Sequence, residues 1–339
     1  MSLSLPPGPD EPSSPETTFS YLHAVTQGRV IAHISHVKFS EPAPLPPGNW
    51  LWFLGTGGNP VNVVTQVQPT GGFLLRMDGT LVHFDPGPGA LVHAARAGLD
   101  LRNLDAVYVS HDHTDHAADA GGVVEAMTHL MSRRKGVLLA GPVSLGPEGM
   151  ISRFHQGVSD EHEGYREGPA QVVALSAGRA VGIGNLSVVP VPAYHSRDNF
   201  GCVVSGGALT VGYTSDTGYI RSYVSRDGQV KSVDYRALHD FEAVAAYHHD
   251  VKEAYQNVNV LVANTSYFNM FANRQLTVLG LIHLLEGSTV KLAVITHLDA
   301  CYSQPTDVRH HLARYVEEKT GVRTVLASEQ APLALDGLV

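Results

Sequence analysis

The six residues from His111 to His116, with the sequence His-Asp-His-Thr-Asp-His, constrain this chain more than any other stretch. They follow the apolar run 106–110, whose β-branched and aromatic side chains predict a buried strand. Open α/β folds place their functional sites at the carboxyl ends of such strands. The three imidazoles and the carboxylate of Asp115 are ligands that suit zinc and similar metals. Because they exceed what one tetrahedral ion needs locally, the stretch predicts two neighbouring metal ions.

The alternative interpretation is that these are solvated loop histidines in a histidine-rich chain. Histidine makes up 19 of the 339 residues, so three histidines at fixed positions arise by chance about 2 times in 10,000 starts. Metal binding is therefore the better explanation of the stretch.

Length and composition predict a soluble cytoplasmic protein. The chain has 43% hydrophobic residues and no apolar run near the roughly 18 residues of a membrane span. Its first residues lack the basic and apolar regions of a signal peptide. Two cysteines, Cys202 and Cys301, cannot form a disulfide framework, which favours a reducing compartment. The net charge of −9 argues against broad electrostatic capture of nucleic acid.

The amino-terminal part predicts a tail followed by one domain. Residues 1–18 are rich in proline, serine and glutamate, which predicts a disordered tail, and residues 19–339 are expected to form a single domain. A first strand is expected at 30–37 and a second at 50–54. The second runs into the glycine loop 55–58, which allows a close backbone approach but lacks the lysine and spacing of a phosphate-binding P-loop.

The remaining chain alternates strands and helices. Strands are expected at 73–77, 81–84, 137–140, 172–175, 186–191, 202–204, 209–213, 258–263, 292–295 and 322–327. Helices are expected at 90–97, 122–134, 238–255, 276–286 and 305–320. Asp78 and Gly79 predict a hairpin turn between the first two of these strands. The long irregular segment 143–170 is either a functional loop or a surface excursion without a role.

Several of the strands end in a residue that can bind a metal. Asp85, the 111–116 stretch, Asp216 and His297 each follow an apolar strand, and His195 follows another. One such histidine is ordinarily explained by packing, but the convergence of several strand ends predicts a common site. Asp85 is expected to support a ligand or to stabilise its own turn.

These motifs, in this order, resemble the metallo-β-lactamase superfamily over roughly residues 50–330. The 111–116 stretch is similar to the family's HxHxDH motif, and three later residues match its other ligand positions. The resemblance implies an α/β fold, a four-layer α/β/β/α sandwich with the site at one edge of two sheets. It implies one zinc ion bound by His111, His113 and His195, a second bound by Asp115, His116 and His297, and Asp216 bridging both.

Within the superfamily, the chain is most similar to the RNase Z-like and cyclic phosphodiesterase branch. Neither cysteine falls on a ligand position, which argues against a β-lactamase. Residues 54–58 and Ser215-Asp216-Thr217 resemble the phosphodiesterase branch. Gln275 stands where RNase Z has a histidine that is thought to protonate the leaving group, and no basic tRNA-binding arm is recognisable. The resemblance also implies a homodimer, with tRNA the less favoured partner.

We therefore predict a dinuclear zinc- or manganese-dependent hydrolase acting on a small anionic phosphodiester, such as a nucleotide or cyclic nucleotide. Two ions would lower the pKa of a shared water, giving a bridging hydroxide, and would neutralise the phosphoryl oxygens. Asp115 and Asp216 are expected to take part in catalysis, and His155 and His162 are the predicted proton donors. Thr296 and Asp299 are expected to orient His297. The alternatives are a carbon-ester hydrolase (a lactonase or a glyoxalase-II-like thioesterase) and a non-catalytic metal-dependent binding protein.

Overall fold

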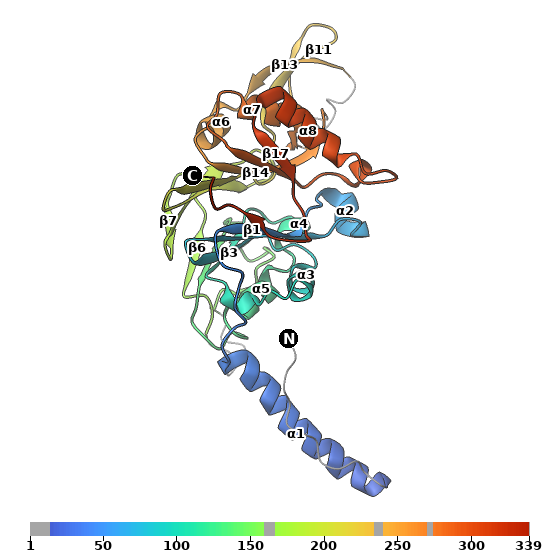
Figure 1. The fold of residues 1–339 in the computed structure, drawn as a ribbon, viewed down its shortest axis with the longest axis vertical. Helices are drawn as coiled ribbons and strands as arrows, with labels where there is room; N and C mark the ends of the chain where they lie inside the picture. The colour runs from blue at the N-terminus through green and yellow to red at the C-terminus, as the bar shows by residue number, and fades with distance from the viewer. Residues whose placement is uncertain (1–13, 159–166, 234–239, 270–273, 339) are drawn as a thin grey trace.

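The computed structural model describes residues 14–158, 167–233, 240–269 and 274–338. Two sheets pack face to face, and helices cover the outer face of each sheet (Figure 1). Helices α3 (Ala90–Arg96) and α5 (Ala120–Met127) pack on the first sheet. Helices α6 (His249–Tyr255), α7 (Val278–Leu285) and α8 (Arg309–Thr320) pack on the second. The predicted four-layer α/β/β/α sandwich is thereby confirmed.

The first sheet is mixed, and the strand that precedes the histidine-rich stretch belongs to its parallel part. Its order is β18 (Leu333–Ala334), β1 (Trp50–Gly55), β2 (Thr70–Met77), β3 (Thr80–Phe84), β4 (Ala106–Val109), β5 (Val137–Ala140) and β6 (Gln171–Ala174). Strands β3 to β6 are parallel neighbours, so their carboxyl ends lie along one edge. Asp78 and Gly79 both have positive φ and close the predicted β2–β3 hairpin.

The second sheet supplies the other strand ends of the site. Its order is β17 (Arg323–Leu326), β16 (Leu292–Thr296), β14 (Val260–Tyr267), β10 (Leu209–Tyr213), β9 (Phe200–Gly206), β8 (Leu186–Pro192) and β7 (Val181–Ile183), and β15 (Leu276–Thr277) pairs with β14. A separate small sheet consists of β12 (Val230–Ser232), β11 (Ile220–Ser225) and β13 (Phe241–Tyr247). The described part of the segment expected to be helical at 238–255 thus forms a strand before α6.

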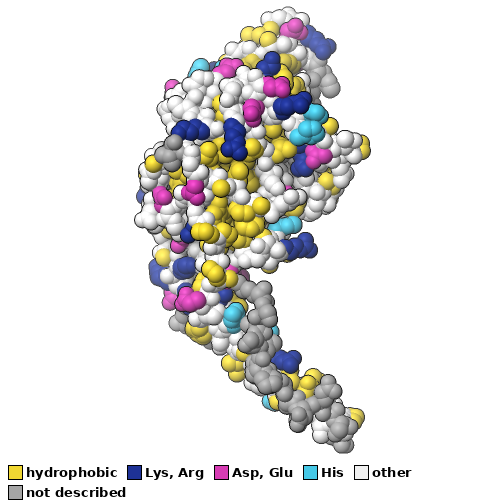
Figure 2. Space-filling view, viewed as in Figure 1, with side chains coloured by type: hydrophobic (Ala, Val, Ile, Leu, Met, Phe, Trp, Pro, Cys, Tyr) yellow, Lys and Arg dark blue, Asp and Glu magenta, His cyan; other side chains and the backbone are white. Residues whose placement is uncertain are grey.

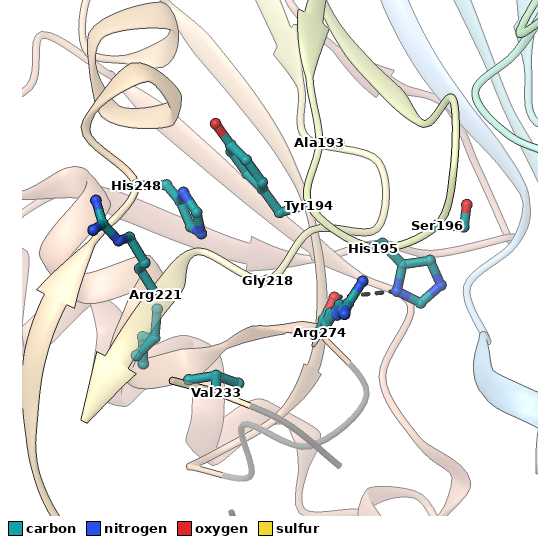
Figure 3. A pocket seen from close by; sticks show the side chains of 10 residues that line it. Ala193, Tyr194, His195, Ser196, Gly218, Arg221, Val233, His248 and Arg274 are labelled. Atoms are coloured by element: carbon teal, nitrogen blue, oxygen red, sulfur yellow. Dashed lines mark hydrogen bonds between the residues drawn. The ribbon is translucent and has the colours of Figure 1, made fainter. Parts of the chain in front are cut away.

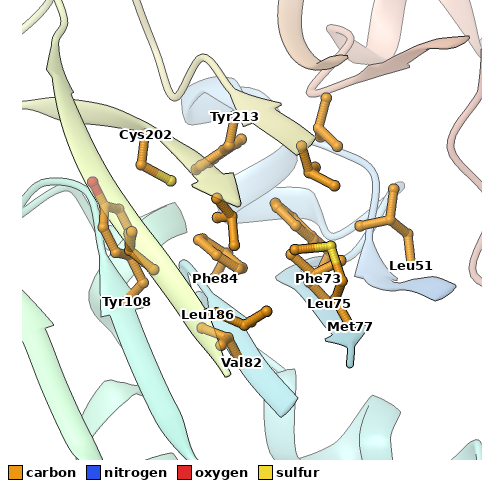
Figure 4. Packing of buried hydrophobic residues seen from close by; sticks show 14 of the residues in the cluster. Leu51, Phe73, Leu75, Met77, Val82, Phe84, Tyr108, Leu186, Cys202 and Tyr213 are labelled. Carbon is orange, nitrogen blue, oxygen red and sulfur yellow. The ribbon is translucent and has the colours of Figure 1, made fainter. Parts of the chain in front are cut away.

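Aromatic side chains join the two sheets in the main core (Figure 4). Phe73 on the first sheet stacks on Phe84 and meets Tyr213 of the second sheet edge to face, with ring centroids 5.0 Å apart. The hydroxyl of Tyr108 donates to the carbonyls of Phe200 and Gly201, at 3.1 and 2.9 Å. These contacts hold the ends of β4, β9 and β10 at the same edge of the sandwich.

Short helical segments flank the strand ends. They are α2 (Asn59–Thr65), α4 (Thr114–Ala117) and the 3-10 helices Leu101–Asn103 and Ala300–Tyr302. Helix α4 begins inside the histidine-rich stretch, so that the side chains of Asp115 and His116 lie in its single turn. The short helix therefore sets the relative directions of these two adjacent side chains.

Helix α1 (Pro15–Phe39) extends away from the sandwich (Figure 1). The strand expected at 30–37 is therefore wrong, and so is the predicted tail for residues 15–18, while residues 1–13 lie outside the described part. The spacing of Val30, Ile34 and Val37 also fits a helix, although the side chains of Val30 and Ile34 are exposed. Ser14 caps the helix through its hydroxyl, which accepts from the Thr17 amide.

The carboxyl end of α1 is attached to the sandwich by Arg102. Its guanidinium donates to the carbonyl of His36 at 3.1 Å and to the hydroxyl of Ser40 at 3.0 Å. It also forms a buried ion pair of 2.7 Å with Asp100. Hydrophobic side chains along α1 are exposed (Figure 2), among them Phe19. Among the described helices, none combines the length and the hydrophobicity that crossing a bilayer requires.

Candidate metal centre

Seven side chains from four strand ends meet at one edge of the sandwich. The β4 end supplies His111, His113, Asp115 and His116, and the ends of β8, β10 and β16 supply His195, Asp216 and His297. All seven of these residues were predicted from the sequence. Most are buried, so that their donor atoms face one another rather than bulk water.

The donor atoms form three overlapping groups, each with its atoms within 4.8 Å of one another. Two of these groups have the members that the resemblance implies for the two ions. The third joins them and consists of His111, His116 and Asp216. The carboxylate of Asp216 lies between the outer groups, with Oδ2 3.7 Å from His195 Nε2 and Oδ1 3.2 Å from His297 Nε2. This is the position from which one carboxylate can bridge two ions.

Two buried ring nitrogens show that the cluster fits metal ions. Nε2 of His116 and Nε2 of His297 have no hydrogen-bond partner within the described protein, although both atoms are buried. Buried polar atoms in proteins ordinarily have a partner. Both nitrogens point toward the carboxylates of Asp115 and Asp216, at distances of 3.2 to 3.7 Å. A divalent cation among these atoms would satisfy the imidazoles and the carboxylates together.

The electrostatics of the cluster also suit a cation. Burial opposes ionisation of Asp115 and Asp216, but the neighbouring imidazoles of His116 and His297 hold both carboxyl pKa values well below their usual range. Burial lowers the pKa of His111 well below its usual value, so its ring is neutral. Asp115 and Asp216 in turn raise the pKa values of His116 and His297 against the effect of burial, so a bound cation would replace the protons on these two rings.

Asp85 supports the cluster from behind, and its predicted supporting position is confirmed. Its carboxylate accepts a hydrogen bond of 2.7 Å from Nδ1 of His116, which directs the opposite nitrogen toward the cluster. It also accepts from the backbone and hydroxyl of Ser110, both at 2.6 Å, and from the hydroxyl of Tyr213 at 2.5 Å. The Ser110 hydroxyl in turn lies 3.0 Å from Nδ1 of His111.

The residue that orients His297 differs from the prediction. Nδ1 of His297 lies 3.2 Å from the hydroxyl of Ser266, on the neighbouring strand β14, and neither Thr296 nor Asp299 takes this place. Asp299 instead accepts from the amide of Cys301. The backbone of His297 has a φ of 66°, in the left-handed region that is uncommon for residues other than glycine. The supporting contact therefore comes across the sheet rather than along the chain.

Arg274 and Gln275 hold two members of the cluster, a role that the sequence did not reveal. The carbonyl of Arg274 lies 3.1 Å from Nδ1 of His195, and the amide of Gln275 donates to Oδ2 of Asp216 at 2.8 Å. Asn264 donates to the other oxygen of Asp216 at 3.0 Å. The sequence identified Gln275 only as a missing proton donor, because spacing alone does not indicate which carboxylate an amide will meet.

The glycine loop 55–58 makes room for His297. A Cβ on Gly58 would lie 2.1 Å from the imidazole of His297, so no larger residue fits without displacing that ring. The next amide, from Asn59 at the start of α2, donates to Oδ2 of Asp115 at 3.2 Å. The close approach expected of this loop is thus made to a residue of the cluster and not to a nucleotide.

A cavity of about 410 Å³ opens beside the cluster. One wall is apolar and consists of Pro60, Val63 and Val64 of α2. Residues of the cluster, together with Gln275, form the opposite wall. A substrate can therefore place an organic group on α2 while its reacting group faces the candidate metal ligands.

Of the two loop histidines expected to donate a proton, His155 is described, and it does not line this cavity. Nε2 of His155 lies 3.0 Å from Oε1 of Glu125 on α5, and its Nδ1 lies 2.9 Å from the hydroxyl of Ser152. The ring also packs over Gly121, so it is held on the outer helix. His162 lies outside the described residues. The loop does lie beside the histidine-rich stretch, since the amide of Met150 donates to Asp112, but the His155 side chain contacts Glu125 of α5 instead.

Comparisons with known proteins agree with this geometry. A family model described as β-lactamase superfamily domain matches residues 80–269. An uncharacterized protein of Methanocaldococcus jannaschii, MJ1374, is 31% identical over 175 residues, which are 50% of this chain and 61% of that protein. Ribonuclease Z of Kineococcus radiotolerans is 29% identical over 160 residues, 46% of this chain and 50% of that enzyme. The chain thus spans about half to three-fifths of the length of these relatives.

Solved structures share the fold at low sequence identity. The metallo-β-lactamase fold protein YhfI from Bacillus subtilis superposes with a TM-score of 0.61 at 15% identity, covering 85% of this chain and all of that one. The short form of human tRNase Z gives a TM-score of 0.55 at 13% identity, covering 84% and 99% of the two chains. A diphosphatase of the PhnP family gives 0.54 at 14% identity, covering 84% and 96%. At these identities the likeness establishes the fold alone.

Proposed function

The chain belongs to the β-lactamase superfamily, and from that premise we propose that it is a metal-dependent hydrolase with a dinuclear centre that cleaves small phosphodiesters. The observation that carries the proposal is the placement of Asp216 between two groups of donors, beside two buried imidazole nitrogens that lack a partner in the described protein. The ribonuclease Z relatives support the phosphodiester as the bond cleaved.

The seven clustered residues would hold the two ions. His111, His113 and His195 would bind one ion, Asp115, His116 and His297 the other, and Asp216 both. Zinc suits this set of nitrogen and oxygen donors, with manganese as the alternative. When bound, the ions would supply an activated water and charge neutralisation at the phosphoryl oxygens.

The protein's own residues position these groups and the substrate. Gln275 and Asn264 each donate to one oxygen of Asp216, which fixes the plane of the proposed bridging carboxylate. Asp115 lines the cavity, where its carboxylate can accept a hydrogen bond from the attacking water and so orient it. Val63 and Val64 would contact the organic part of the substrate and exclude water from that side.

The cavity walls determine which leaving groups can depart. Apart from the proposed ligands, none of the described residues that line this cavity has a side chain that titrates near neutral pH. Gln275 lines it, but a carboxamide is not an acid in this range. We propose that the proton for the leaving group comes from solvent, and we expect the rate to fall steeply as the leaving group becomes more basic.

The size and charge of the molecule favour a small substrate. A cavity of about 410 Å³ accommodates a nucleotide-sized ligand, and the net charge of −9 disfavours a polynucleotide such as tRNA. We further propose a cytoplasmic homodimer: both cysteines are free, which suits a reducing compartment, and the dimer is the assembly that the family resemblance implies.

A substrate panel tests the proposal. Metal-loaded protein is assayed with bis-p-nitrophenyl phosphate, p-nitrophenyl phosphate, a lactone and a thioester, and the diester is expected to react fastest. Asp216→Ala should abolish most of this activity. Asp112→Ala is the matched control, because the Asp112 carboxylate contacts the amide of Met150 and lies outside the donor groups. A panel in which the lactone or the thioester reacts fastest would contradict the proposal.

A further inference from the structure

A second cavity, of about 280 Å³, shares His195 with the cavity beside the cluster (Figure 3). Tyr194 and Gly218 line this cavity, together with three side chains that can carry a positive charge or donate hydrogen bonds. These are Arg221 from β11, Arg274 from the segment before β15, and His248 from the start of α6.

The two arginines are not neutralised by the described protein. Within the described ranges, neither guanidinium forms an ion pair or a side-chain hydrogen bond, and both residues are exposed. The nearby carboxylate of Asp250 is engaged instead, since it accepts a hydrogen bond of 2.5 Å from the hydroxyl of Tyr194. Two guanidinium groups that have no ion pair within the described ranges thus line one cavity of a chain whose net charge is −9.

Backbone contacts place both arginines beside the candidate metal centre. The carbonyl of Arg274 contacts Nδ1 of His195, and the carbonyl of Arg221 accepts from the amide of Val233 across the small sheet. The His248 ring stacks on Tyr194, with centroids 3.6 Å apart. Burial lowers the pKa of His248, so the ring is neutral near pH 7 and presents one N–H donor. The cavity is therefore lined by several hydrogen-bond donors.

We propose that this cavity binds a second phosphate of the substrate through Arg221 and Arg274, so that the preferred substrates are phosphodiesters that carry an additional terminal phosphate. Planar guanidinium groups match phosphate oxygens in pairs, which makes arginine the usual side chain for such recognition. Because His195 belongs to both cavities, a substrate whose diester lies at the metal centre extends its second phosphate past this ring. This inference rests on the proposed phosphodiesterase function.

Two substrates that differ by one phosphate test the inference. They are thymidine 5′-(p-nitrophenyl phosphate) and the same compound with an added 3′-phosphate. We expect metal-loaded wild-type protein to favour the second compound in kcat/KM by about 10- to 100-fold, the range of charge-assisted contacts. Arg221→Gln should remove most of this preference. Arg179→Gln, which removes an exposed arginine from a turn outside the cavity, should keep it.

Binding of the product provides a readout that does not depend on turnover. Calorimetry with metal-loaded protein should show thymidine 3′,5′-bisphosphate binding about 10-fold or more tightly than thymidine 5′-monophosphate, and Arg221→Gln should remove the difference. Arg274→Gln, which keeps the carbonyl that contacts His195, should do the same.

The failures of the two proposals are distinguishable. Equal kcat/KM values for the two esters, together with equal product affinities in wild type and Arg221→Gln, would overturn the second-phosphate site and leave the phosphodiesterase intact. If neither ester is hydrolysed, the phosphodiesterase proposal fails, and the product affinities alone decide whether the arginines bind phosphate.

Discussion

The side-chain amide of Gln275 donates a hydrogen bond of 2.8 Å to Oδ2 of Asp216, the carboxylate that lies between the two groups of donors. Both residues are buried, so this contact is shielded from water. An amide at this position thus holds the carboxylate in place, whereas the histidine expected from the RNase Z-like branch would offer a proton. Gln275 therefore supplies no proton at this position but stabilises the proposed bridging carboxylate.

The first prediction concerns this contact. Gln275→Leu removes the donor and leaves a buried carboxylate oxygen without it, so metal affinity should fall by about 10- to 100-fold. Competition with a chromophoric chelator measures the change. Gln229→Leu, at an exposed position in the small sheet's turn, is the control and should bind metal as wild type does. Unchanged affinity in Gln275→Leu would show that the amide does not support the bridge.

The second prediction concerns the space that Gly58 leaves for His297. Gly58→Ala would place a methyl group 2.1 Å from the imidazole, so the ring must move and the ion it helps to bind should be lost. Elemental analysis should then give about one ion per chain in place of about two. Gly182→Ala is the matched control, because a Cβ at Gly182 meets nothing within 4 Å. Full metal content in Gly58→Ala would contradict the expected displacement.

The third prediction concerns the attachment of α1. Arg102→Ala leaves the buried carboxylate of Asp100 unpaired and removes the donor to the last carbonyls of α1. We expect a loss of about 3–5 kcal/mol in the free energy of unfolding, measured in urea, and faster proteolytic cleavage near residue 40. Arg314→Ala breaks an exposed pair with Glu318 and should cost less than about 1 kcal/mol. Equal effects of the two substitutions would contradict this account.

The fourth prediction concerns acid sensitivity. Burial lowers the pKa of His83 from 6.5 to about 4, while its Nε2 contacts the carbonyl of Gly71. Since the unfolded chain takes up this proton first, the stabilising contribution is complete above about pH 6.5 and is lost as the pH falls toward 4. The difference corresponds to about 3 kcal/mol.

A variant isolates this contribution from those of the other histidines. Between about pH 7 and pH 4, His83→Gln should lose about 2–3 kcal/mol less stability than wild type, as measured by urea unfolding at each pH. Parallel losses in the two proteins would show that the pKa of His83 in the folded state is not depressed.

The sequence predicted the residues of the candidate site well because their pattern is local. His111 to His116 lie in one stretch, and the other candidate ligands each follow an apolar strand, so alternation and strand ends were sufficient signals. Ser266 was missed because its contact with His297 joins two neighbouring parallel strands. The sequence pattern does not show which residues of two such strands lie next to each other. The contact of Gln275 with Asp216 was missed because it joins two segments that are 59 residues apart in the chain.

The errors in secondary structure have a different cause. Residues 30–37 are rich in β-branched side chains, and this favoured a strand, although Val30, Ile34 and Val37 also have helical spacing. The strand β13 lies where a helix was expected because pairing with β11 is a tertiary contact that local propensity does not register. His155 was expected at the site from its loop, but its partner Glu125 lies on the outer helix α5.

The central claim is that two ions act together in phosphodiester cleavage, and a zinc titration tests it most directly. Chelator-treated protein is titrated with zinc while bound metal and hydrolysis of bis-p-nitrophenyl phosphate are measured on the same samples. We predict that activity rises mainly with the second ion and saturates at about two ions per chain. Activity that saturates at about one ion per chain, or that persists in metal-free protein, would contradict the dinuclear account.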